Sequence, residues 1–99
     1  MNNRTKAANL LVKMTWLRNQ PVLATMEIDV NRIDWQRLDV IEWTPQQKVL
    51  IEVFRFLLTD NGDFKLNDLL SIDPYEREAI LVALHTRFTL IEMQESLVP

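Results

Sequence analysis

The sequence contains no cysteine, which excludes disulfide bonds, thiolate metal sites and a cysteine nucleophile. This absence also fits a reducing compartment. Glycine occurs once, at position 62. A chain with a single glycine has neither the glycine-rich loops that cradle phosphate groups nor the G-x-S-x-G turn of many serine hydrolases. It also has little scope for tight β-hairpins, whose favoured turns need positive φ, so helices joined by short connections are expected.

Long hydrophobic runs are missing as well. No apolar stretch approaches the roughly 18 residues of a membrane span, and no segment near the start is typical of a secretory signal. These absences predict a cytoplasmic protein with no membrane partner. The chain is 47% hydrophobic and 25% charged over 99 residues, which is typical of one packed globular domain spanning residues 1–99.

Acidic residues are absent before Glu27, and the basic residues in that stretch are Arg4, Lys6, Lys13 and Arg18. The first half of the chain, residues 1–50, has a net charge of +2, and the second half has −5, within a total of −3. The N-terminal segment is therefore a cationic end on an acidic body.

Residues 5–18 have the periodicity of an amphipathic helix with one buried face. That face is predicted to hold Ala7, Leu10, Leu11, Met14 and Leu17. The other side carries Lys6, Asn9, Lys13 and Trp16. Pro21 ends whatever precedes it, because the residue before a proline is pushed out of the α-helical region.

The pattern then changes to a period of two. Apolar residues alternate with polar ones across 24–30, which predicts a strand with one buried face. Residues 89–93 are ambiguous, since they either extend the last helix or form a second strand that pairs with the first. A two-stranded ribbon packed on helices is the resulting expectation.

The clearest helix start lies at Thr44-Pro45. Thr44 is suited to the N-cap, Pro45 to the first helical position, and Gln47 completes a capping box. The helix that follows, through Leu58, is apolar over more than half of its circumference, so it must be covered on most sides. A second capping box, Asp73 to Glu76, opens a helix to about Arg87. Its predicted apolar face is Ile80, Leu81, Leu84 and Phe88.

These elements predict a mainly α, compact helical domain built around a central buried helix at about 45–58. Between the two long helices, Leu66–Leu70 is expected to form one short helical turn.

The stretch TDNGDFKLNDLL between them resembles part of a calcium-binding EF-hand loop. Such a loop needs an aspartate at position 1, a glycine at position 6 and a bidentate glutamate at position 12. These positions are Thr59, Phe64 and Leu70, so the charge and the turn that calcium requires are missing. We expect no metal here. Asn61-Gly62 is instead a turn signal that ends the central helix with a left-handed cap, after which Phe64 and Leu66 re-enter the core.

Catalytic and cofactor sites find no support in the sequence. His85 is the only histidine, and neither a second histidine nor a nucleophilic serine accompanies it at a useful spacing. No carboxylate lies in an apolar setting that would raise its pKa. We predict no enzymatic activity and no cofactor, and keep His85 as the one residue on which an activity would depend.

The three tryptophans divide into two groups. Trp35 and Trp43 flank a short helix and are expected to fill the core. Trp16 falls opposite the apolar stripe of the first helix with Val12 one turn away, among Lys6 and Lys13. An apolar pair in such a setting is covered either by a second layer of the fold or by a partner. Lys6, Val12, Lys13 and Trp16 are therefore the predicted partner-binding residues.

From Thr44 onward the element order resembles a winged helix: a long helix, the short helix LNDLL, the turn SID, the helix PYEREAILVALHTRF and a strand TLIEM. The likeness covers about half of the chain and rests on no family-specific motif. It implies DNA binding through the second helix of a helix-turn-helix. That helix begins with Asp73, Glu76, Arg77 and Glu78, whose net charge has the wrong sign for phosphates.

The prediction for function is a non-enzymatic protein–protein interaction module, a small adaptor, regulator or inhibitor. Its partner would be another protein or a second copy in a homodimer, because a small domain leaves much of its apolar residue content near the surface. The alternative is a winged-helix-like DNA-binding regulator that uses the basic N-terminal helix.

Overall fold

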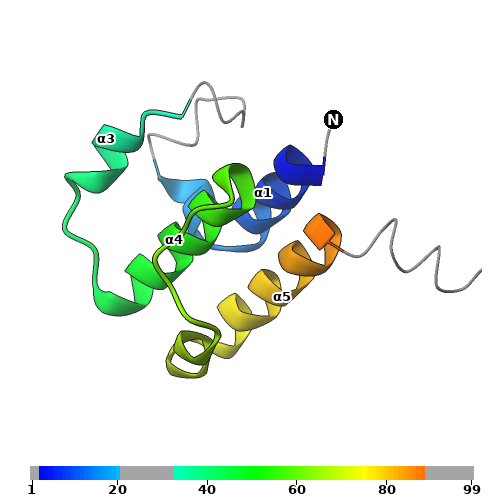
Figure 1. Ribbon diagram of the computed structural model, residues 1–99. Helices are drawn as coiled ribbons and strands as arrows, with labels where there is room; N and C mark the ends of the chain where they lie inside the picture. The colour runs from blue at the N-terminus through cyan, green and yellow to red at the C-terminus, as the bar shows by residue number, and fades with distance from the viewer. Residues whose placement is uncertain (1–2, 21–32, 89–99) are drawn as a thin grey trace, which may run out of the picture.

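The computed structural model describes residues 3–20 and 33–88 (Figure 1). The helices within these ranges are α1 (Asn3–Met14), η1 (Trp16–Asn19), α3 (Trp35–Asp39), α4 (Pro45–Thr59), η2 (Leu66–Ser71) and α5 (Pro74–Phe88), where η marks a 3-10 helix. The prediction of a mainly α, compact domain is confirmed for this part of the chain. The short turn predicted at Leu66–Leu70 is η2.

The two predicted strands, 24–30 and 89–93, lie outside the described residues. Within 3–20 and 33–88 no residue is in a strand, so the predicted ribbon gains no support.

The first helix is shorter than predicted, because Thr15 interrupts it. Its backbone is extended (φ −132°, ψ 179°). The Thr15 hydroxyl donates to the Leu11 carbonyl at 2.7 Å and accepts the N–H of Leu17 at 3.3 Å, so Thr15 both closes α1 and caps η1. A threonine that bonds to the backbone on both sides competes with the helix, which the periodicity alone did not reveal.

The buried face of α1 also differs from the prediction. Ala7, Ala8 and Leu11 are buried, whereas Met14 is 46% exposed and Leu10 is only partly covered. The reason is the partner helix: α1 packs most extensively against α5, and α5 turns Ala79 and Ala83 inward. Two alanines on each helix are fully buried, and small side chains allow two helices to approach closely.

The same packing corrects the predicted face of α5. Ile80 is buried as predicted, but Leu81 is 48% exposed and Phe88 is 43% exposed. Because the alanines at 79 and 83 form the inner face, the larger residues at 81 and 88 are turned outward. The apolar residues of α5 point in several directions around the helix, so its neighbours decide which of them are buried.

The helix α4 carries more buried residues than any other helix described. They are Leu50, Ile51, Glu52, Val53, Phe54, Leu57 and Leu58. Its start has the predicted capping box. The Thr44 hydroxyl accepts the N–H of Gln47 at 3.2 Å, and the Gln47 side-chain oxygen accepts the N–H of Thr44 at 2.9 Å.

One carboxylate joins the ends of the three long helices. Asp60, the C-cap of α4, accepts hydrogen bonds from Arg4 of α1 at 2.5 Å and from Arg87 of α5 at 2.7 Å. The ends of α4 and α5 therefore lie together with the beginning of α1, so α1 runs opposite to the other two helices (Figure 1).

The corner after α4 is a turn, but its left-handed residue is not in the Asn61-Gly62 pair. Asp60 adopts φ 64° and ψ 8°, and Gly62 does not have positive φ. Glycine is needed at 62 for space instead. A Cβ there would lie 2.4 Å from the Glu52 carbonyl oxygen and 2.9 Å from Phe56 Cβ. The corner thus passes close over the backbone of α4.

No group of three or more histidine or acidic side chains with metal-binding geometry occurs among the described residues. In the same ranges, none of the helices combines the length and the apolar character needed to cross a bilayer.

Candidate functional site

The residues predicted to bind a partner are only partly at the surface. Lys6 and Lys13 are exposed on α1, whereas Val12 and Trp16 are partly buried against the core. The ring of Trp16 lies 5.5 Å from that of Trp43. Of the two explanations for the Val12–Trp16 pair, a second layer of the fold accounts for much of its cover, and Trp43 belongs to that layer.

Trp43 is itself held in place by the preceding segment. Its indole N–H donates to the Leu38 carbonyl at 2.9 Å, next to the short helix α3. Trp35 of α3 packs 5.9 Å from Phe54, and the Arg55 guanidinium lies 5.1 Å above the Trp35 ring. Both tryptophans are partly buried against the core, in the region where the sequence placed them.

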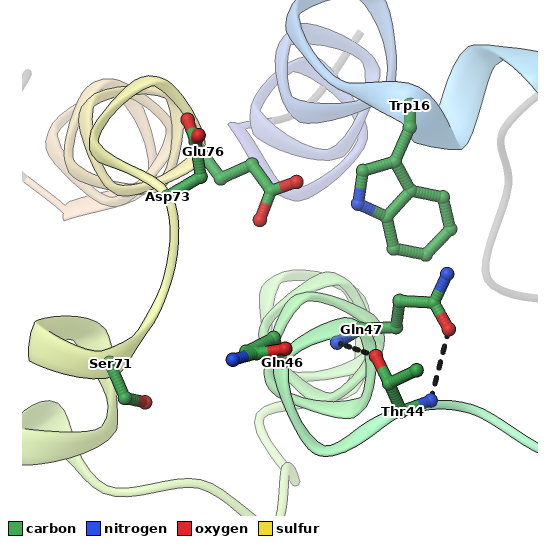
Figure 2. Close-up of a pocket in the computed structure, with 7 residues that line it drawn as sticks. All are labelled: Trp16, Thr44, Gln46, Gln47, Ser71, Asp73 and Glu76. Carbon is green, nitrogen blue, oxygen red and sulfur yellow. Dashed lines mark hydrogen bonds between the residues drawn. The ribbon is translucent and has the colours of Figure 1, made fainter.

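A polar pocket of about 350 Å³ opens beside Trp16 (Figure 2). Its lining comes from η1, the start of α4, the end of η2 and the start of α5, and consists of Trp16, Thr44, Gln46, Gln47, Ser71, Asp73 and Glu76. Thr44 and Gln47 already use their polar atoms in the capping box. This pocket has two carboxylates and a serine.

Glu76 points across this pocket toward Trp16 (Figure 2). Burial raises the pKa of Glu76, the negative charge of Asp73 raises it further, and a hydrogen bond from the Trp16 side chain opposes both effects. The sequence did not identify this carboxyl, because the apolar surface beside it comes from a distant helix. Among the described residues, none that lines this pocket is a histidine.

A second hollow, of about 420 Å³, has a different character. We call it the aromatic groove, and its residues are Phe56, Gly62, Phe64, Leu66, Leu84 and Phe88. They come from α4, the corner, η2 and α5. Every side chain in this set is apolar, so the groove offers no acid, base or nucleophile. It suits apolar side chains of another molecule.

Phe56 is the centre of the aromatic groove. Its ring lies 5.7 Å from Phe64 in an edge-to-face arrangement and 5.9 Å from Phe88. The close approach of Gly62 to α4 is what brings Phe64 back to Phe56, since a side chain at 62 would push the corner away. The groove therefore depends on the single glycine of the chain.

Two polar contacts position the segments that form the groove, one at the corner and one at the end of α5. The buried carboxylate of Glu52 accepts the backbone N–H of Asp63 at 3.0 Å, which ties the corner to α4. At the end of α5, Arg87 donates to the Leu57 carbonyl at 3.4 Å, and its guanidinium lies 4.8 Å from the Phe88 ring centre. The Phe88 ring is thus in contact with both Arg87 and Phe56.

The rim of the groove is unusually open for apolar residues. Leu66 and Phe88 of the groove are 71% and 43% exposed, and Leu70 of η2, which does not line the groove, is also 71% exposed. The prediction that Leu66 re-enters the core is wrong, because η2 is a short helix that buries only Leu69 of its three leucines and leaves Leu66 and Leu70 exposed. Phe64 is partly buried against the core as predicted.

The exposed apolar surface continues along α5. Tyr75 is 86% exposed, and Leu81 and Phe88 are about half exposed. Glu78 and His85 lie exposed between them. We call these five residues the α5 stripe. His85, the only candidate for an activity in the sequence, is therefore part of an outer helix face.

Comparison of the chain with family models, with curated proteins and with solved structures gives no match. The winged-helix likeness, which rested on element order alone, accordingly gains no support from a known fold.

Proposed function

We propose that this protein is a non-enzymatic interaction module, and that the aromatic groove binds apolar side chains of a protein partner. The observation that supports the proposal is an apolar hollow built from three elements with two apolar rim residues, Leu66 and Phe88, open to solvent. Exposed apolar hollows of this kind are typical of binding sites, and aromatic anchors supply much of the affinity at such interfaces.

An exposed apolar groove destabilises the free protein. Each exposed leucine or phenylalanine forgoes about 25 cal/mol for every Å² of apolar surface left in water. The alanine packing of α1 on α5 directs Phe88 outward, and η2 leaves Leu66 exposed. A partner that covers both residues recovers that free energy. The role of small adaptor, regulator or inhibitor fits a domain whose main surface feature is such a hollow.

The proposal is tested by capture from a lysate of the source organism with matched variants. Leu66→Glu places a charge on the groove rim at an exposed position, so the fold should be retained. Val40→Glu is the control, because Val40 is 80% exposed and does not line the groove. We expect a specific partner to be retained by the wild type and by Val40→Glu, and lost by Leu66→Glu. Equal retention by all three would contradict the proposal.

Nucleic-acid binding is the second candidate, and the exposed Lys6 and Lys13 on α1 favour it. They lie seven residues apart, on the same side of the helix. The same capture experiment separates this alternative when nuclease is added. Retention that disappears with nuclease and with Lys6→Ala/Lys13→Ala, but survives Leu66→Glu, would favour the nucleic acid. That outcome would also keep the lysine face, with Val12 and Trp16 beside it, as the binding surface.

A further inference from the structure

We infer that a second copy of this chain packs on the α5 stripe, with the two α5 helices antiparallel about a twofold axis near Leu81. This inference rests on the proposed function, since it names a partner for the exposed apolar surface that meets the aromatic groove at Phe88. It follows from the order of the residues along the stripe and from the charges at the two ends of α5.

The stripe is a single line along the helix. After Pro74, the exposed residues of α5 are those of the stripe: Tyr75, Glu78, Leu81, His85 and Phe88. Their spacings of three, three, four and three residues keep them on one side of a 3.6-residue helix. Spacings of three and four residues are those by which one helix packs along another.

The order of the stripe is self-complementary. Reversal about a point between Leu81 and Val82 exchanges Tyr75 with Phe88 and Glu78 with His85, and it brings the two copies of Leu81 together at the centre. In an antiparallel pair each Glu78 therefore faces His85 of the second copy, twice by symmetry. An isologous twofold interface requires this kind of pattern, in which one patch is complementary to itself.

The charges at the helix ends favour the antiparallel direction. The charges that lie on the stripe are Glu78 near the start of α5 and His85 near its end, whereas Glu76 points toward Trp16 and Arg87 pairs with Asp60. Antiparallel packing places the acidic end of one copy beside the basic end of the other, and the helix dipoles also oppose. A parallel pair would instead place Glu78 beside Glu78 of the second copy.

The aromatic groove extends the contact beyond the two helices. Phe88 belongs both to the stripe and to the groove, so Tyr75 of the second copy arrives beside the groove rim. A 15-residue helix is only about 22 Å long, which limits what the helix pair itself can bury. We therefore expect a weak dimer, with a Kd of about 10–100 µM, because the contact is smaller than the roughly 800 Å² per subunit of a standard interface.

Sedimentation equilibrium of the full chain, over a concentration range that brackets about 10–100 µM, tests the inference. The wild type and Val40→Glu should dimerise equally, and Leu81→Glu should weaken the dimer at least tenfold, since two like charges would meet at the axis. Circular dichroism checks that Leu81→Glu keeps its helix content. A monomeric wild type, or a dimer that Leu81→Glu leaves unchanged, would overturn the inference.

A charge exchange tests the direction of the helices independently of folding. Glu78→Lys alone and His85→Glu alone should each weaken the dimer. The double variant should restore it, because a positive charge at position 78 then faces a negative charge at position 85 of the second copy. Failure of the double variant to recover would overturn the antiparallel arrangement.

These readouts are separate from partner capture. If the wild type is a monomer but Leu66→Glu abolishes capture of a partner, only the second copy as the occupant of the stripe is refuted. If the wild type is a dimer but Leu66→Glu does not change capture, only the proposed function of the groove is refuted.

Discussion

At the scale of single residues, the region around Glu52 and Gly62 decides whether the aromatic groove exists. Glu52 is only 5% exposed, and a buried carboxylate is costly unless its oxygens are satisfied. One oxygen accepts the N–H of Asp63, and the other lies 3.5 Å from both the Lys48 ammonium and Arg55 Nε. That second oxygen makes no hydrogen bond, so the contact with Arg55 is one of charge alone. Gly62 thus lets the corner approach α4, and the hydrogen bond to the Glu52 carboxylate holds it there.

We predict that Gly62→Ala lowers the free energy of unfolding by about 1–3 kcal/mol, the usual cost of forcing an extra carbon into packed structure. The new Cβ would overlap the Glu52 carbonyl oxygen, which is backbone and cannot rotate away. Urea denaturation followed by circular dichroism measures the change. Asn67→Ala, at an exposed position of η2, is the control and should stay within about 0.5 kcal/mol. Equal stability of Gly62→Ala and the wild type would show that the corner is not tightly packed.

At the scale of single elements, local signals explain where the helices begin and neighbours explain which sides they bury. The capping box at Thr44 is made by residues three apart, so it forms wherever the rest of the chain goes. The end of α1 is equally local, since Thr15 bonds to Leu11 and Leu17. By contrast, the inner side of α5 depends on contact with α1.

We also predict how much the N-cap of α4 contributes to the stability of the protein. Thr44→Ala removes the acceptor of the Gln47 N–H and should destabilise the protein by about 1 kcal/mol, the typical cost of losing an N-cap. Thermal or urea unfolding checks the value. Gln46→Ala changes an exposed neighbour that takes no part in the box, so it should have little effect. If both variants lost the same stability, the cap would not be the cause.

At the scale of the whole molecule, Asp60 connects three helix ends that are far apart in the sequence. The hydrogen bond from Arg4 holds the pKa of Asp60 below its ordinary value of 3.8, and the charges of Arg4 and Arg87 act in the same direction against partial burial. A lowered pKa in the folded state means that the ionised form stabilises the fold. This stabilisation is present above pH 3.8 and is lost as the pH falls through the lower, folded-state pKa.

We therefore predict that Asp60→Asn melts at a lower temperature than the wild type at pH 7, and that the gap narrows as the pH falls below 3.8. Asparagine tolerates the left-handed conformation of this position, so the comparison isolates the charge. Asp63→Asn removes a carboxylate from the same corner and controls for a general loss of charge. Melting temperatures measured from pH 7 to about pH 2.5 provide the test. A gap that stays constant over this range would contradict the role of Asp60.

The candidate site was only partly predictable. The patch of Lys6, Val12, Lys13 and Trp16 was predicted from the periodicity of the first helix alone. In the structure Trp43 packs against Trp16 and covers part of this patch. The aromatic groove was not predicted, since Phe56, Phe64 and Phe88 are each an ordinary apolar residue at their own place in the chain. The exposure of Leu66 and Leu70 was not predicted either, because a helical turn of six residues does not by itself show which of its leucines is buried.

The sequence by itself determined the caps, the length and the apolar character of α4, and the absence of glycine loops and thiols, because these depend on residue type and on neighbours within four positions. The tertiary structure alone decided which side of α5 faces water and where the three phenylalanines meet. Close packing that involves two alanines of α1 and two of α5 selected which of the apolar residues of α5 are buried. The surface left exposed by that selection is the one on which both proposals depend.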